Sequence, residues 1–271
     1  MLNDTWEQLI TYPLGKRTAK PREKGLTMVL DKGLGLRELS DLLEIAGEYL
    51  DFLKLGFGTS LLYKKEILQA KIKLCQEYQV EIYPGGTLME IALRQGKYKT
   101  YLEQIQKLGF KTIEISDGTI TVNTQKREDC IKQAVNAGFR VLSELGKKNL
   151  KNIFSPRELW KQGETDLKNG AWKVIIEARE SGKGIGIYNH KGEIEETKLK
   201  NLLKNCPDHS KIIWEAPLKN QQVDLIHRFG TKVNLGNILP QDLLALEALR
   251  TGLRADTLPL IPDFTNKIHC L

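Results

Sequence analysis

The chain has 271 residues, of which 41% are hydrophobic and 28% charged, an ordinary composition for a folded globular protein that excludes a disordered chain. No apolar run approaches the roughly 18 residues of a membrane span, and the first residues do not read as a signal peptide. The net charge of +7 suits small anionic substrates, whereas the lysines are spread over helix faces without aromatic partners, so we expect no nucleic acid partner. The four cysteines form no CxxC pair, which argues against zinc sites and disulfides, and we expect a cytoplasmic protein.

Short runs rich in Val, Ile and Leu alternate with helical patterns along most of the chain, which is typical of alternating strands and helices. After an irregular lead-in over 1–24, strands are predicted at 27–31, 52–56, 80–84, 112–116, 140–145, 173–177, 211–215 and 232–235. Helices are predicted near 36–49, 64–78, 98–108, 125–137 and 241–253, with a shorter turn over 88–93. Ser155 followed by Pro156 predicts a further helix start. A serine side chain caps the first turn, and proline has no backbone N–H that would lack a hydrogen-bond partner there.

Eight such strand and helix units predict an α/β fold with a parallel sheet closed into a (β/α)8 TIM barrel. No stretch rich in Pro, Gly or Ser divides the chain, so we expect a single barrel domain over 25–257 and a tail over 258–271. The apolar tail residues Leu258, Leu260, Ile261 and Phe264 could form a subunit interface or pack on the barrel.

Acidic residues end or lie within most of the predicted strands. Side chains two apart share a face of a strand, so residues that alternate with helix-facing apolar positions should point into the barrel. This alternation predicts an inward ring of carboxylates at the carboxyl end of the barrel: Asp31, Glu114, Glu144, Glu177 and Glu215. Lys54 and Lys148 are the cations that alternation places nearest to this ring.

Burying so many carboxylates without compensation would cost several kcal/mol each or force protons onto them. A divalent metal relieves that charge, and hard oxygen ligands without a cluster of His or Cys favour Mg²⁺. The five carboxylates are therefore candidate Mg²⁺ ligands. The alternative for any one of them is a solvated or ion-paired strand end.

Several loops after predicted strands could hold an anion, among them GFGTS, PGGT, SDGT, ARESGKG and NLGN. Gly85 and Gly86 let backbone amides approach a ligand closely, although ordinary tight turns use the same residues. In the segment ARESGKG, Arg179 and Lys183 flank small residues including Ser181, a composition that suits phosphate or sulfonate. The segment NLGN, with Asn234, Gly236 and Asn237, follows the eighth strand, where barrels frequently bind phosphate.

The ordered strings GLTMVLDKGLG, DFLKLGFGTS, YPGGTLME, IEISDGT, LSELGKK, VIIEARESGKG, IWEAP, VNLGNI and LRTGLRADT closely resemble the phosphosulfolactate synthase family. The resemblance covers about residues 25–257. It implies a (β/α)8 barrel and a Mg²⁺-dependent lyase that adds sulfite to phosphoenolpyruvate, giving (2R)-phospho-3-sulfolactate. It also implies a homo-oligomer and, in methanogens, the first step toward coenzyme M.

The same resemblance bears on the catalytic residues. The GKK motif, Gly146 to Lys148, resembles the family segment that carries the proposed acid. Alternation selects Lys148 as the inward lysine and leaves Lys147 as a second candidate. Lys54 joins them as a catalytic candidate because an ammonium group can stabilise the carboxylate dianion that forms when sulfite adds. None of the four histidines ends a predicted strand, which favours lysine over histidine in this role.

Two alternatives stay open. Another addition or aldol-type reaction of an enolate could use the same barrel. A catalytically divergent relative with a stress-related or interaction role could also keep the fold, since the resemblance extends to such proteins in plants. The pathway served, whether coenzyme M, sulfolactate or another, is not fixed by the sequence.

Overall fold

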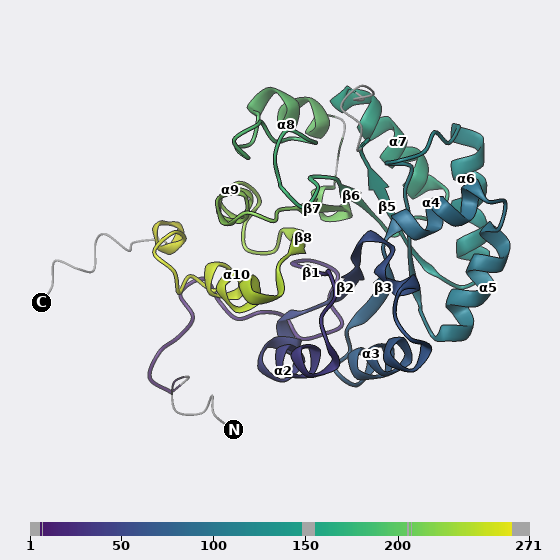
Figure 1. Ribbon diagram of the computed structural model, residues 1–271. Helices are drawn as coiled ribbons and strands as arrows, with labels where there is room; N and C mark the ends of the chain where they lie inside the picture. The colour runs from purple at the N-terminus through teal and green to yellow at the C-terminus, as the bar shows by residue number, and fades with distance from the viewer. Residues whose placement is uncertain (1–5, 7, 148–154, 205, 207, 262–271) are drawn as a thin grey trace, which may run out of the picture.

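The computed structural model describes residues 6, 8–147, 155–204, 206 and 208–261 and contains one sheet of eight parallel strands. The strands are β1 (Thr27–Asp31), β2 (Phe52–Leu55), β3 (Glu81–Pro84), β4 (Thr112–Ile115), β5 (Arg140–Leu145), β6 (Lys173–Ile176), β7 (Ile212–Glu215) and β8 (Asn234–Ile238). Their hydrogen-bonded order is β3-β2-β1-β8-β7-β6-β5-β4. Because β3 and β4 also lie side by side, the sheet curls into a nearly closed barrel (Figure 1).

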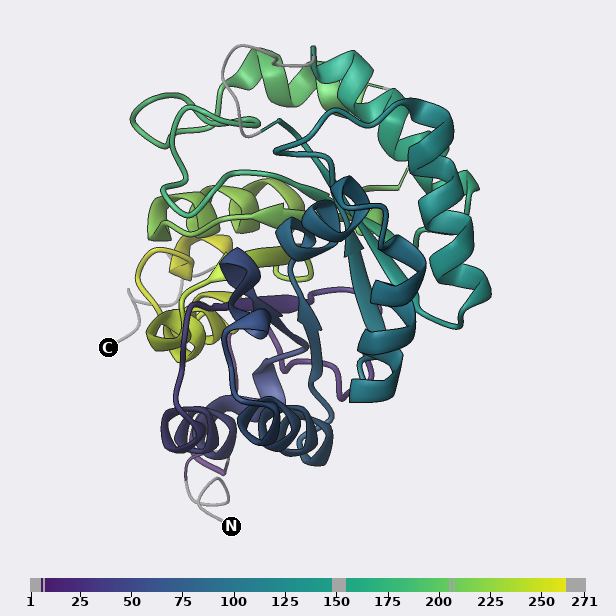
Figure 2. The ribbon, with the colours of Figure 1, turned by 45° about the vertical axis from the view of Figure 1, so that its right-hand side comes forward.

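Helices surround the sheet, as the two views in Figures 1 and 2 show. They are α2 (Leu36–Ala46), α3 (Lys65–Glu77), α4 (Gly86–Arg94), α5 (Tyr98–Leu108), α6 (Thr124–Asn136), α7 (Pro156–Lys168), α8 (Glu196–Leu203), α9 (Lys219–Phe229) and α10 (Leu243–Arg250). Each buries an apolar stripe against the sheet, such as Leu39, Leu43 and Ala46 of α2. Among the described residues, no helix is long and apolar enough to cross a membrane.

The predicted (β/α)8 barrel is confirmed, and seven of the strands lie within a residue of their predicted bounds. The eighth was wrong: β8 begins at Asn234 and runs to Ile238, so Asn234 starts the strand rather than lying near its end. The Ser155 start of α7 is confirmed as a capping box, in which the hydroxyl accepts from the Glu158 amide and the Glu158 carboxylate accepts from the Ser155 amide.

Each face of the sheet carries its own apolar layer. Val29, Leu53, Val141, Val174 and similar residues pack outward against the helices. A smaller cluster fills the barrel interior, consisting of Leu26, Met28, Phe52, Tyr83, Leu142, Ile175 and Ile213. The interior cluster lies below the polar residues at the carboxyl ends of the strands and fills the barrel beneath them.

Residues 8–24 of the predicted lead-in are irregular, but buried ion pairs tie this segment to the amino-terminal end of the barrel. Arg17 Nε lies 3.0 Å from a Glu247 oxygen of α10, and Arg22 Nε lies 3.1 Å from Asp51 Oδ1. The other oxygen of Asp51 accepts a hydrogen bond of 2.8 Å from the Thr27 amide at the start of β1. Burial raises the pKa of Asp51 even though Arg22 lies beside it.

Replacing Arg22 by leucine should therefore leave the buried Asp51 carboxylate without its main cation. We expect Arg22→Leu to lower the free energy of unfolding by about 3–5 kcal/mol, as when one partner of a buried pair is removed. Urea denaturation followed by circular dichroism measures the loss. Arg157→Leu, at an exposed position of α7, is the matched control. A loss below about 1 kcal/mol for Arg22→Leu, the range of exposed pairs, would contradict this account.

Candidate active site at the carboxyl end of the barrel

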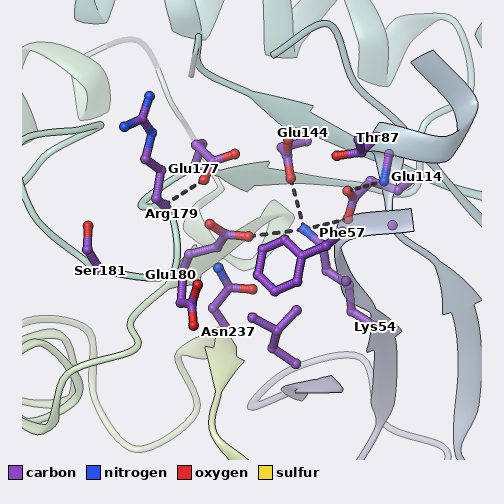
Figure 3. Close-up of a pocket in the computed structure, with 15 residues that line it drawn as sticks. Lys54, Phe57, Thr87, Glu114, Glu144, Glu177, Arg179, Glu180, Ser181 and Asn237 are labelled. Atoms are coloured by element: carbon purple, nitrogen blue, oxygen red, sulfur yellow. Dashed lines mark hydrogen bonds and ion pairs between the residues drawn. The ribbon is translucent and has the colours of Figure 1, made fainter. Parts of the chain in front are cut away.

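A cavity of about 440 Å³ opens at the carboxyl ends of the strands (Figure 3). That volume lies in the range of small-molecule sites. Its walls carry five carboxylates and two cations, together with small and apolar residues of the loops. The lining residues are Leu30, Lys54, Gly56, Phe57, Gly85, Gly86, Thr87, Glu114, Glu144, Glu177, Arg179, Glu180, Ser181, Glu215 and Asn237.

Lys54 of β2 is the electrostatic centre of this cavity. Its Nζ lies 3.0 Å from Glu114, 2.9 Å from Glu144 and 3.2 Å from Glu215, so one ammonium group joins β4, β5 and β7 (Figure 3). Burial alone would lower the pKa of Lys54, but the attraction of the three glutamates outweighs it and holds the pKa well above its ordinary value. Lys54 therefore stays charged and acts as a fixed positive group.

The remaining oxygens of two of these glutamates bind the loops. Glu114 Oε1 accepts from the Gly86 amide at 2.7 Å, and its Oε2 also accepts from the Tyr83 hydroxyl at 3.2 Å. Burial, and then the Glu114 charge, raise the pKa of Tyr83, so the phenol keeps its proton and donates it. Glu215 Oε2 accepts from the Ala178 amide at 2.9 Å. The carboxylates thus fix loop backbone as well as the cation.

Glu177 completes the group of inward glutamates that the sequence predicted. It follows β6, and its Oε1 accepts a hydrogen bond of 2.5 Å from the Arg179 amide. Gly146 packs against it so closely that a Cβ there would lie 2.9 Å from the Cβ of Glu177. The structure therefore brings Glu114, Glu144, Glu177 and Glu215 to the wall of one cavity, as alternation along the strands predicted, and Glu114, Glu144 and Glu215 contact Lys54.

The predicted inward orientation of Asp31 was wrong. In β1 it is Met28 and Leu30 that face the interior, and Val29 packs outward. The Asp31 carboxylate accepts from the Gly33 and Leu34 amides at 2.7 and 2.8 Å and lies 2.5 Å from Lys71 Nζ of α3. A buried lysine on a helix, which strand alternation cannot reveal, supplies its cation on the outer side of the sheet.

The loop of Gly85 and Gly86 lines the cavity, but its first two amides are already used. The Gly85 amide donates to the Leu55 carbonyl at 2.9 Å, and the Gly86 amide donates to Glu114. A Cβ at Gly86 would lie 2.5 Å from the Cβ of Ser116. Close packing of the first turn of α4 on the loop after β4 explains this glycine, whereas an anion role for the pair stays a prediction.

The loop after β6 contributes Arg179 and Ser181 to the cavity wall, as predicted, together with Glu180. Lys183 is exposed and does not line the cavity. Arg179 is a cation of the wall, and Figure 3 shows its side chain directed away from Lys54. An anion can therefore meet Arg179 without displacing the Lys54 cluster.

The three site residues predicted in the NLGN segment after the eighth strand lie on β8 itself, at different depths of the barrel. Asn237 lines the cavity. Gly236 faces inward below it, where a Cβ would lie 2.4 Å from the Met28 methyl group. Asn234 lies at the opposite, amino-terminal end, where its amide binds the backbone of Leu26, Ser210 and Ile212 at 2.9–3.0 Å. The error in the strand bounds is the reason that Asn234 was expected at the site.

Strained backbone gathers at the same cavity. Three of the four described non-glycine residues with positive φ line it: Phe57 at 55°, Arg179 at 58° and Asn237 at 54°. Such conformations cost of order 1–3 kcal/mol each and tend to cluster at functional sites. Asn237 adds a second sign, because its buried Oδ1 has no hydrogen-bond partner in the part of the chain that the structure describes.

The structure describes only one of the two lysines of the GKK motif. Lys148 lies outside the described residues, so its predicted role as the acid stays a prediction. Lys147 does not line the cavity. Its Nζ pairs with the Asp117 carboxylate and donates to the Asp117 and Ile120 carbonyl oxygens at 2.7 and 3.3 Å. Lys147 thus joins the loops after β4 and β5.

Sequence reasoning missed several residues that shape the site. Glu180 lines the cavity and pairs at 2.6 Å with Lys32, across the barrel mouth between the loops after β6 and β1. Buried Arg127 of α6 binds Asp117 and Asp166 at 2.9 Å each and donates to the Glu144 carbonyl at 2.9 Å. Glu180 lies inside the ARESGKG motif and could have been noticed there, whereas nothing in the local sequence identifies Arg127.

The oxygen-rich wall has the chemistry that Mg²⁺ prefers. Among the described residues, no three His, Cys, Asp or Glu side chains already form a metal-binding group. That arrangement is compatible with Mg²⁺, which typically takes one or two protein carboxylates and completes its shell with water and substrate phosphate. The cavity wall offers such oxygens from carboxylates, among them Glu144 and Glu177, and from the amide of Asn237.

The sequence of this chain is similar to those of known proteins. Residues 15–256 match the family model for (2R)-phospho-3-sulfolactate synthase (ComA). The phosphosulfolactate synthase of Methanothermobacter thermautotrophicus is 46% identical over 244 residues, covering 89% of this chain and 94% of that protein. The phosphosulfolactate synthase of Bacillus subtilis is 38% identical over 243 residues, covering 89% of this chain and 95% of that one.

Solved structures show similarity of fold alone. A 3-hexulose-6-phosphate synthase superposes with a TM-score of 0.56 at 12% identity, covering 83% of this chain and 98% of that one. A phosphonopyruvate hydrolase in complex with oxalate and Mg²⁺ gives 0.53 at 14% identity, covering 84% and 80%. Both comparisons agree with the barrel described above.

The fold and the charged cavity define a (β/α)8-barrel enzyme whose site lies at the carboxyl ends of its strands. The match over most of the chain makes the assignment specific. The chain belongs to the phosphosulfolactate synthase family, whose members are lyases that form a carbon–sulfur bond.

Removing the cation at the centre of the cavity should lower the free energy of unfolding by an amount that depends on pH. The pKa of Lys54 is raised in the folded protein, so its stabilisation is fully present below the unfolded value of 10.5 and is lost only as pH rises through the folded value. Lys54→Met should cost about 3–5 kcal/mol at pH 8, because three carboxylates lose their cation. At about pH 11 the loss should be smaller, because the pH is then above the unfolded value of 10.5 and part of the stabilisation from Lys54 is gone in the wild type.

Urea unfolding at both pH values measures the difference. Lys99→Met, at an exposed position of α5, is the control and should change stability little at either pH. An equal loss for Lys54→Met at both pH values would rule out the glutamate cluster as the source of its effect.

Proposed function

We propose that the protein is a Mg²⁺-dependent phosphosulfolactate synthase that adds sulfite to phosphoenolpyruvate to give (2R)-phospho-3-sulfolactate. The observation that carries the proposal is the cavity in which Lys54 is held by Glu114, Glu144 and Glu215, within a chain 46% identical to a protein named for this activity. We further expect a homo-oligomer in the cytoplasm, as the sequence resemblance implies.

The reaction builds negative charge in a place that the cavity can compensate. Sulfite sulfur attacks the terminal carbon of the enol phosphate, and the electron pair moves through the double bond onto the carboxylate, giving an aci-carboxylate dianion. A proton then adds to carbon two. The first step needs fixed positive charge near the substrate carboxylate. The second step needs a proton donor on one face of carbon two.

This chain's residues divide those tasks. Lys54 is a permanent cation at the floor of the cavity, and its high pKa makes it a charge-stabilising group rather than a proton donor. Arg179, on the wall, is placed to meet the phosphate or the sulfonate. Lys148 is proposed as the proton donor, with Lys147 as the second candidate.

The proposed metal site uses Glu144, Glu177 and Asn237 at the cavity wall. When bound there, Mg²⁺ would supply Lewis-acid stabilisation of the substrate carboxylate and offset the excess of glutamates. Glu114 and Glu215 are less suited to ligation, because each divides its oxygens between Lys54 and a loop amide. Asp31 is outside the cavity wall and paired with Lys71.

A direct assay tests the reaction. Purified protein incubated with phosphoenolpyruvate, sulfite and Mg²⁺ should produce phosphosulfolactate, detected by mass spectrometry, and a chelator should abolish the product until Mg²⁺ is restored. Omitting sulfite should leave phosphoenolpyruvate intact. Failure to form any sulfonated product would overturn the proposal, and consumption of phosphoenolpyruvate without sulfite would favour another enolate-forming reaction.

The two lysines of the GKK motif can be separated by their kinetics. Lys148→Ala should lower kcat by several orders of magnitude if Lys148 delivers the proton to carbon two. Lys147→Ala should lower it much less, about tenfold, because Lys147 is held by Asp117 outside the cavity. Steady-state kinetics with both substrates measures each effect. A larger loss for Lys147→Ala than for Lys148→Ala would exchange the two roles.

A further inference from the structure

A buried glutamate on α4 takes no part in the cavity but shapes a loop beside it. Glu90 is fully buried, and its two oxygens accept hydrogen bonds from the Gly118, Thr119 and Ile120 amides at 3.0, 2.9 and 3.2 Å. The hydroxyl groups of Ser116 and Thr119 also donate to it. One carboxylate therefore collects five donors from the segment 116–120, the loop that follows β4.

That loop holds Lys147. The Lys147 ammonium binds three acceptors of this loop, namely the Asp117 carboxylate and the carbonyl oxygens of Asp117 and Ile120. Arg127 binds the same Asp117 at 2.9 Å. The Lys147 ammonium is therefore tied to a loop whose backbone Glu90 binds.

The same helix also touches the cavity. Gly86 and Glu90 are four residues apart on α4, so they lie on one face of the helix. The Gly86 amide donates to Glu114, an ion-pair partner of Lys54, and Glu90 binds the loop 116–120 one turn further along the helix. Helix α4 thus fixes both the Lys54 cluster and the Lys147 loop with respect to β4.

We propose that Glu90 is a positioning residue that, through the loop 116–120, holds the ammonium group of Lys147 against Asp117 and Ile120 at the carboxyl end of the barrel. The proposal rests on the proposed function for its kinetic part. Its structural part is independent of the substrate. Glu90 contributes no contact to the cavity itself, so it acts through the loop alone.

Glu90→Gln tests the proposal because it keeps the size of the side chain but turns one acceptor into a donor that faces the loop donors. We expect hydrogen exchange in 116–120 to rise at least tenfold. The labelling of Lys147 by an amine-reactive reagent, measured by peptide mass spectrometry, should rise similarly. In the sulfite addition assay, kcat should fall by about three- to tenfold, no more than in Lys147→Ala, while KM for phosphoenolpyruvate changes less than about threefold.

Two further variants make the test decisive. Glu103→Gln, at an exposed position of α5, should change none of these measurements. Thr119→Val removes one hydroxyl donor at an exposed position and should give a smaller change of the same kind, which serves if Glu90→Gln does not fold.

The outcomes separate the two proposals. If the wild type forms no sulfonated product, the proposed function fails, and the positioning role is judged on loop exchange and Lys147 labelling alone. If Glu90→Gln lowers thermal stability but leaves Lys147 labelling and loop exchange as in the wild type, Glu90 is only a structural residue and the inference is overturned.

Discussion

The ammonium group of Lys54 is the interaction on which the site depends. Three buried glutamates from β4, β5 and β7 converge on it within 3.2 Å, so the cation joins three strands that form no hydrogen-bonded pair with β2. Without it, buried carboxylates would face one another at the carboxyl end of the barrel, an arrangement that favours protonation or unfolding. The cluster therefore both closes the barrel electrostatically and holds a charged cavity ready for anionic substrates.

Much of this could be predicted from the sequence because a barrel strand obeys a simple rule. Alternation against the apolar residues that face the helices placed Lys54, Glu114, Glu144, Glu177 and Glu215 inward, and the structure confirms each orientation. The rule depends on local apolar neighbours alone. It assumes that a charged residue at the end of a strand points into the barrel, which holds for these residues and fails for Asp31 of β1.

The errors have two physical causes. Asp31 was placed inward because the cation that neutralises it, Lys71, lies on a helix forty residues away and buries its charge on the outer side of the sheet. Asn234 was placed at the site because β8 contains two asparagines around a glycine, and the pattern does not show which of them begins the strand. Residues such as Glu90 and Arg127 were not found because their partners come from other elements, a tertiary arrangement that periodicity does not contain.

The carboxylates at this end of the barrel serve two purposes at once. Glu114 binds Lys54 and the Gly86 amide, Glu215 binds Lys54 and the Ala178 amide, and Glu177 binds the Arg179 amide at the cavity wall. The same carboxylates that set the charge of the cavity therefore also fix the backbone of the loops after β3 and β6. Changing one of these glutamates to glutamine would present an amide donor to either the ammonium or the loop. Loss of activity in such a variant reports loop shape as much as metal binding, and direct measurement of Mg²⁺ affinity is needed to separate the two effects.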